Sequence, residues 1–182
     1  MSTVLVPLAE GFEEIEAITI IDLLRRAGVT VTTAALQSGL VRGSHGIGLA
    51  ADTTLDAVLA RDFDMVVLPG GLPGAHHLRD DARVQALLQR HAAAGAYTAA
   101  ICAAPVALAQ AGLLAGRAAT SYPGFVEKLD IPGLRHSDDA VVVDGKVVTS
   151  RGPGTAMDFA LTLIELLCGK GQRDAVEAGL VR

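Results

Sequence analysis

The sequence predicts an α/β fold in which a mainly parallel sheet carries helices on both faces. Short β-branched, apolar runs alternate with stretches of helical periodicity along most of the chain. The central runs are apolar throughout, which is typical of parallel strands covered on both sides. Three of these runs end in loops that hold an acidic residue, a glycine pair or a cysteine. Ligands bind at such strand ends in parallel sheets.

The composition narrows the class of protein. The 182 residues suit one domain, expected over residues 1–182, and 51% hydrophobic with 3% aromatic residues predicts an aliphatic core. A net charge of -5 argues against a nucleic-acid groove. The N-terminus lacks a signal-peptide pattern, and no apolar run reaches membrane-spanning length. Two cysteines in this context predict free thiols and a cytoplasmic protein that binds no membrane.

The first part of the chain predicts strands over residues 3–8 and 29–36. Between them, residues 13–27 have helical period and Gly28 ends the helix. Residues 41–50 are interrupted by glycines and predict a short hairpin or excursion. Residues 52–55 resemble a cap that opens a brief helix.

The middle of the chain predicts the central strands. Residues 64–68 form one, followed by a loop over 69–74, and residues 80–94 form a helix that stops at Gly95. Residues 96–101 form the next strand, and residues 105–111 continue as helix.

The last part predicts a hairpin and two helices. A short strand over 118–121 precedes one or two helical turns over 124–129. Asp144-Gly145 joins two β-branched runs, a strong hairpin signal. Thr155 and Asp158 resemble a capping pair for a helix over 156–168, and a last helix lies near 174–178.

One residue stands out on the first helix. A wheel places Glu16 inside the apolar stripe formed by Ala17, Ile20, Leu23, Leu24 and Ala27. A carboxyl there is partly desolvated, which favours its protonated form. The alternative is a surface residue that complements the helix dipole, and this is what we expect of Glu13 and Glu14. Ile15 and Ile18 point off the stripe and indicate either a partner subunit or isolated exposed residues.

Cys102 occupies the junction between a predicted strand and a predicted helix. Ala100 and Ala104 flank it in the small-x-nucleophile-x-small pattern of a nucleophile elbow, where bulky neighbours would collide. Such a turn aims the free N–H groups of the helix start at the side chain and favours a thiolate. The alternative is a buried structural cysteine, which is the commoner fate of this residue type.

The neighbouring loops suggest what Cys102 would need. Gly70 and Gly71 allow backbone N–H groups to approach a reacting oxygen, and the N–H of Ala103 would be a second oxyanion donor. A neutral Glu16 could donate a hydrogen bond to the thiolate or pass a proton to a substrate. Alternatively, residues 70–74 are simply a turn-rich loop.

No cofactor or metal is expected. Residues 70–74 are neither a P-loop nor a dinucleotide fingerprint. His76 and His77 form a pair without a third ligand nearby, and the other histidines show no ligand spacing: His45, His91 and His136. Cys168 is taken as structural.

Four segments together resemble the ThiJ/PfpI superfamily, and within it the branch of the parkinsonism-associated protein deglycase and its bacterial YajL-type relatives. The segments are residues 99–105 (AAICAAP), 67–71 (VLPGG), 11–16 (GFEEIE) and 149–155 (TSRGPGT). The resemblance covers almost the whole chain. It implies a flavodoxin-like α/β sandwich and a homodimer with the first helix at the interface. It also implies Cys102 as an easily oxidised nucleophile and Glu16 as its protonated partner.

The implied activity is a cofactor-free glyoxalase or protein deglycase that acts on methylglyoxal, glyoxal or their protein adducts. Chaperone and oxidative-stress roles are implied as well. The alternative is a redox sensor and redox-regulated chaperone without significant turnover, and a third reading is a small-molecule binding domain with a vestigial site.

Three positions depart from the family pattern. Tyr122 stands where animal members carry a histidine near the cysteine. It can still donate a hydrogen bond at a substrate site but is a poorer proton shuttle at neutral pH. Ala103 stands where the protease-like branch has histidine, which argues against a Cys-His protease. His45 replaces an arginine, which weakens any carry-over of dimer contacts.

Overall fold

The computed structural model describes residues 1–182, and its centre is a seven-stranded sheet in the order β10-β11-β7-β6-β1-β2-β5. Every neighbouring pair is parallel except β10 and β11, which form the predicted antiparallel hairpin. The strands are β1 (Thr3–Leu8), β2 (Thr30–Ala35), β5 (Thr53–Thr54), β6 (Met65–Leu68), β7 (Tyr97–Ile101), β10 (Val141–Asp144) and β11 (Val147–Ser150).

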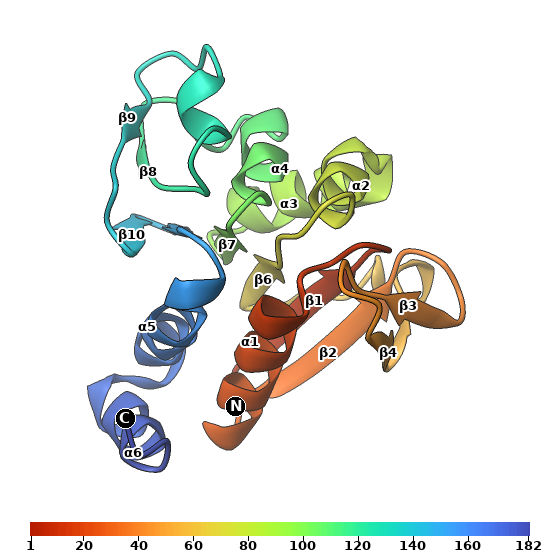
Figure 1. Cartoon of the computed structure of the whole chain (residues 1–182), viewed down its shortest axis with the longest axis vertical. Coiled ribbons are helices and arrows are strands. Elements are labelled where there is room, and N and C mark those ends of the chain that lie inside the picture. The colour runs from red at the N-terminus through yellow and green to blue at the C-terminus, as the bar shows by residue number, and fades with distance from the viewer.

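Helices cover both faces of this sheet (Figure 1). On one face lie α1 (Glu14–Arg26), α5 (Ala156–Cys168) and α6 (Lys170–Ala178); on the other lie α2 (Gly74–Asp80), α3 (Ala82–Ala93) and α4 (Pro105–Gln110). The arrangement is the flavodoxin-like α/β sandwich that the sequence predicted. The β1, β6, β7 and β11 strands are parallel, so their carboxyl ends meet at one edge.

Two small sheets lie outside the central one. The predicted hairpin over 41–50 is β3 (Leu40–Arg42) paired with β4 (Gly48–Ala50). The run at 118–121 contributes β8 (Ala118–Ala119), which pairs with β9 (Arg135–His136) instead of joining the central sheet. Short 3-10 turns complete the chain at η1 (Asp56–Val58), η2 (Val126–Lys128) and η3 (Pro153–Thr155).

The predicted helix over 80–94 is wrong at its start. The helix α3 begins only at Ala82, because the Asp81 carboxylate caps it by accepting from the N–H groups of Arg83 (2.8 Å) and Val84 (3.3 Å). The preceding residues form the separate helix α2, which the glycine- and proline-rich sequence did not suggest. This extra helix follows directly on the Gly70 loop.

Two predicted helix caps are also wrong. The Asp52 carboxylate accepts from the backbone and hydroxyl of Thr33 (both 2.8 Å) and so fixes the edge strand β5, whereas the expected brief helix, η1, begins at Asp56 without a side-chain cap. Thr155 hydrogen-bonds Gly152 and Ser150, not the start of α5. Asp158 pairs with Arg182 at 2.6 Å.

The core is aliphatic, as predicted. One hydrophobic cluster of 50 buried residues runs through the molecule, and Phe12, Phe63 and Phe159 are its only aromatic members. The predicted stripe of α1 is buried, whereas Ile15 (58% exposed) and Ile18 (45%) lie on its open side. No helix combines the length and apolar character needed to cross a lipid bilayer.

His91 is a buried polar residue with a structural role. Its Nε2 accepts from the N–H of Phe63 (3.2 Å), so the ring proton sits on Nδ1, which donates to the carbonyl of Leu87 (2.8 Å). The imidazole therefore ties α3 to the chain just before β6, and it stacks on the Phe63 ring.

We expect His91→Leu to lower the free energy of unfolding by about 2 kcal/mol, because it leaves the buried N–H of Phe63 without a partner. Urea denaturation measures this. His77→Leu, an exposed histidine on α2, is the matched control and should change the same free energy by less than about 0.5 kcal/mol. Equal effects of the two substitutions would contradict this role.

Candidate functional site

Cys102 sits on a strained turn where β7 gives way to α4. Its φ is 63°, in the left-handed region that non-glycine residues rarely adopt, and only Val181 shares this feature. Hydrogen bonds on both sides hold the strain: Cys102 N–H donates to Ser150 O (2.9 Å), and Tyr122 N–H donates to Cys102 O (2.8 Å). The turn has the geometry of the elbow expected from the sequence.

Glu16 lies against Cys102 inside the molecule. It is fully buried in the first turn of α1, so its reading as a surface residue is wrong. Its Oε2 accepts from Gly70 N–H (2.8 Å), its Oε1 has no hydrogen-bond partner, and its carboxyl lies beside the Cys102 side chain, so that each affects the pKa of the other. The first helix, the β6 loop and the β7 turn thus meet at one carboxyl group.

Gly70 allows this meeting. A Cβ on Gly70 would lie 2.7 Å from Cys102 Cβ and 2.7 Å from Glu16 Oε2, closer than side chains tolerate. Gly71 has φ 89°, and a Cβ there would lie 2.3 Å from Glu13 N. These contacts exclude the reading of residues 70–74 as an ordinary turn-rich loop.

The backbone donors are divided between the two groups. Gly70 N–H is occupied by Glu16, so it is not free to serve as an oxyanion donor as the sequence suggested. The N–H groups of Gly71 and Ala103 instead lie beside the Cys102 sulfur, where they lower the pKa of its thiol. They are the two donors beside the atom where a substrate oxygen would be held.

Burial governs the acidity of both groups. It raises the pKa of Glu16 from 4.5 to about 7, helped by the negative charge of Glu13 and opposed by hydrogen bonds from Cys102 and Gly70. Burial and the charge of an ionised Glu16 raise the pKa of the Cys102 thiol, whereas the Gly71 and Ala103 amides lower it. The amides of the turn therefore favour the thiolate, as expected from the sequence, while burial and an ionised Glu16 oppose it.

Cys102 and Glu16 titrate as a pair, since a charge on one disfavours a charge on the other. The pair loses one proton near pH 7 and keeps the second into alkaline solution. A thiolate would receive hydrogen bonds from Gly71, Ala103 and a protonated Glu16, whereas a carboxylate would receive them from Gly70 and a weakly donating thiol. Three donors against two favour the proton on Glu16 and the charge on sulfur.

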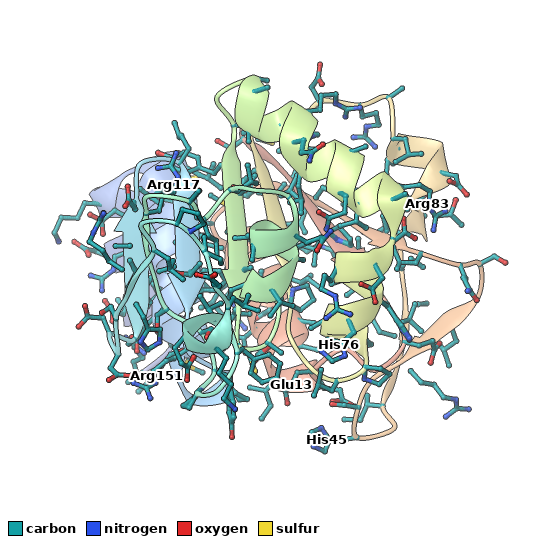
Figure 2. The ribbon with its side chains drawn as sticks, turned by 90° about the horizontal axis from the view of Figure 1, so that it is seen from above. Glu13, His45, His76, Arg83, Arg117 and Arg151 are labelled. Carbon is teal, nitrogen blue, oxygen red and sulfur yellow. The ribbon has the colours of Figure 1, made fainter.

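Glu13 and Glu14 are buried, which corrects their assignment to the surface. Burial would raise the pKa of Glu14, but hydrogen bonds from the side chain and backbone of His45 and from Ile47 N–H outweigh it and lower the pKa to about 2. These bonds, with His45 Nδ1 at 3.0 Å, join the β3–β4 hairpin to the start of α1. Figure 2 shows Glu13 and His45 at the same edge of the molecule.

Glu13, Glu14 and His45 also form the one cluster with metal-ligand types, all ligand atoms lying within 4.8 Å of one another. The Glu14 oxygens already accept from His45 N–H, Ile47 N–H, Ser44 Oγ and His45 Nδ1. The cluster is therefore a set of hydrogen bonds that fixes the β3–β4 hairpin to the start of α1. Sequence reasoning missed it because His45 lies 31 residues from Glu14.

The remaining candidates lie around this centre. Tyr122 is half exposed, and its ring lies over Gly152, where a Cβ would be 3.3 Å from the ring. A cavity of about 330 Å³ at the ends of β1 and β2 contains neither Cys102 nor Glu16. Cys168 is an exposed free thiol at the end of α5, so its assignment as a structural residue is wrong.

Comparison with known proteins identifies the fold and its relatives. The model of the DJ-1/PfpI family matches residues 2–166. The solved structure of oxidized DJ-1 from Toxoplasma gondii superposes with a TM-score of 0.94 at 43% identity, covering 100% of this chain and 98% of that one. The glutathione-independent glyoxalase DJR-1.2 of Caenorhabditis elegans is 36% identical over 88% of this chain and 85% of its own length.

Some relatives are longer. Protein DJ-1 homolog A of Arabidopsis thaliana is 44% identical over 98% of this chain, but the match covers 46% of that protein. The chain thus spans about half the length of that relative.

The raised pKa of Glu16 makes stability depend on pH. The folded protein holds a proton that the unfolded chain releases between pH 4.5 and about 7, so the contribution of Glu16 to stability is fully present below this window and is lost across it. The rise corresponds to about 3 kcal/mol. We expect Glu16→Gln to raise the free energy of unfolding by up to this amount at pH 8 and to change it little at pH 4.5. Denaturation at both pH values checks this, and an equal effect at both would contradict it.

We expect Gly70→Ala to lower the free energy of unfolding by about 1–3 kcal/mol, because its Cβ would overlap both Cys102 and Glu16. Gly154→Ala is the control, since a Cβ there meets nothing within 4 Å. Thermal denaturation compares them. Similar melting temperatures for the two variants would contradict the close packing at Gly70.

Proposed function

Because this chain belongs to the DJ-1/PfpI family, we propose that it is a cofactor-free glyoxalase or protein deglycase that uses Cys102 as nucleophile and Glu16 as acid and base. Its substrates are small 2-oxoaldehydes such as methylglyoxal and glyoxal, or their adducts on proteins. The observation that carries the proposal is the buried carboxyl of Glu16 against the Cys102 sulfur, beside two free-standing backbone donors. The glyoxalase described in Caenorhabditis elegans supports it.

The first step forms a carbon–sulfur bond. The Cys102 thiolate attacks the aldehyde carbon of the 2-oxoaldehyde, and the carbonyl electron pair moves onto its oxygen. The Gly71 and Ala103 N–H groups stabilise that oxygen as charge develops. Glu16 then gives it a proton, which yields a hemithioacetal and leaves Glu16 as a carboxylate.

The second step moves hydrogen between carbons. The Glu16 carboxylate removes the proton from the former aldehyde carbon, and the electron pair of that bond forms an enediolate with its negative charge on the neighbouring oxygen. Glu16 returns the proton to the neighbouring carbon, and the hydroxyl proton of the sulfur-bearing carbon moves to the neighbouring oxygen, which gives a thioester of a 2-hydroxy acid. Water hydrolyses this thioester, releases the 2-hydroxy acid and restores the pair. The net change is the addition of one water to the 2-oxoaldehyde.

The pKa of about 7 suits Glu16 to this work, because one group must both give and take a proton near neutral pH. Tyr122 is assigned to the substrate-binding edge, since its own backbone N–H donates to Cys102 O and its ring is half exposed. In the deglycase reaction the same carbonyl carbon is attacked while it is still attached to an amine or thiol.

Two further features belong to the proposal. The chain forms a homodimer, and the exposed Ile15 and Ile18 on α1 provide an apolar face for it. It acts as one domain over residues 1–182, and a cytoplasmic location stays a prediction from the sequence.

A redox role is the second candidate, supported by the oxidized state named for the similar Toxoplasma gondii structure. A thiolate at Cys102 would react with peroxide to give sulfenic and then sulfinic acid. Intact-mass spectra after mild peroxide test it. An oxygen adduct on Cys102 without turnover of methylglyoxal would favour this role over the enzyme.

We expect Cys102→Ser to reduce lactate formation from methylglyoxal by at least about 100-fold, because the hydroxyl is not ionised near neutral pH. Cys168→Ser, which removes the other free thiol, should retain the wild-type rate. Deglycation is measured separately with free methylglyoxal trapped, since removal of free aldehyde mimics repair. Equal lactate formation by wild type and Cys102→Ser would contradict the proposal.

A further inference from the structure

Glu13 contacts both the helix turn of Glu16 and the loop of Gly70. Its Oε2 accepts from Glu16 N–H at 2.7 Å, and its own N–H donates to Gly70 O at 2.9 Å. It is 6% exposed, in the position immediately before α1. One residue therefore fixes the helix turn that carries Glu16 and the loop that holds the Glu16 carboxyl.

The charges around Glu16 are few. Cys102 faces it from the end of β7, Glu13 from the start of its own helix, and the β6 loop presents only the Gly70 amide. No lysine or arginine lies within 4.0 Å of Glu13, Glu14 or Glu16. The nearest cation is a protonated His45, whose Nδ1 is 3.9 Å from Glu13 Oε1 and 3.0 Å from Glu14 Oε2.

A helix cap requires only a hydrogen-bond acceptor, and serine, threonine, asparagine or aspartate are the residues usually found there. A buried glutamate beside a second buried carboxyl costs free energy through like-charge repulsion. The repulsion disfavours the ionised form of Glu16 and has no effect on its protonated form. A charged acceptor at this position therefore disfavours ionisation of Glu16, whereas a neutral cap would not.

We propose that Glu13 is a positioning residue for the proposed reaction, and that its negative charge keeps the shared proton on Glu16 and so leaves the charge of the pair on the Cys102 sulfur. The inference rests on the proposed function only for its catalytic consequence. The placement of the proton is a property of the free protein and is measured without substrate.

Three substitutions separate the cap from the charge. Glu13→Asp keeps a charged cap, whereas Glu13→Gln and Glu13→Ser keep an acceptor without charge. Infrared spectra recorded across pH follow the carboxyl band of protonated Glu16, assigned by its loss in Glu16→Gln. Glu14→Gln is the matched control, because it removes a charge from an equally buried neighbour whose carboxylate points to the hairpin.

We expect the midpoint of the Glu16 band to move to lower pH by about one unit in Glu13→Gln and Glu13→Ser, because the repulsive charge is gone. Glu13→Asp and Glu14→Gln should stay within about 0.3 units of wild type. The variants should fall in the same order in the pH profile of lactate formation. The part of the profile that depends on Glu16 should shift to lower pH in Glu13→Gln and Glu13→Ser only.

Equal midpoints in wild type, Glu13→Gln and Glu13→Ser would overturn the proposal and leave Glu13 as a simple cap. A shift in Glu13→Asp as large as in Glu13→Gln would also overturn it, because the effect would then follow side-chain length. If the infrared midpoints sort by charge while no variant or wild type forms lactate, the role of Glu13 stands and the proposed enzymatic function fails.

Discussion

The structure depends on one constraint, the burial of the Glu16 carboxyl against the Cys102 sulfur. A carboxyl group is rarely buried without a cationic partner, and here its only backbone donor is the amide of Gly70. Several features of the neighbouring backbone make that contact possible. Gly70 and Gly71 lack side chains where any Cβ would collide, and Cys102 adopts a left-handed backbone to turn its sulfur toward the carboxyl.

The same contact explains the placement of charge. Two acidic groups in one apolar space cannot both ionise near neutral pH, so the pair holds one negative charge. The backbone decides where it lies, since the amides of Gly71 and Ala103 point at the sulfur. A neutral carboxylic acid and a nucleophilic sulfur then stand side by side, which is the combination that attack on an aldehyde followed by proton transfer requires.

Much of this could be predicted from the sequence. Alternation of apolar strands and amphipathic helices predicted the sheet and its layers, and the small residues on either side of Cys102 predicted the nucleophile elbow. The helical wheel placed Glu16 on the buried side because local periodicity decides that face. Burial of Glu13 and Glu14 could not be predicted, since it depends on a hairpin that approaches from residues 42–48. The loss of Gly70 as an oxyanion donor likewise follows from a contact with Glu16 that no local pattern contains.

The most direct test is the ultraviolet absorbance of the thiolate, taken as wild type minus Cys102→Ala and followed from acidic to alkaline pH. We expect thiolate absorbance to rise in one step centred near pH 7, because the pKa of about 7 found for Glu16 marks the first proton lost by the coupled pair and the charge then lies on sulfur. If the difference stays flat until strongly alkaline pH, the charge of the pair resides on Glu16, and Cys102 is not a thiolate near neutral pH.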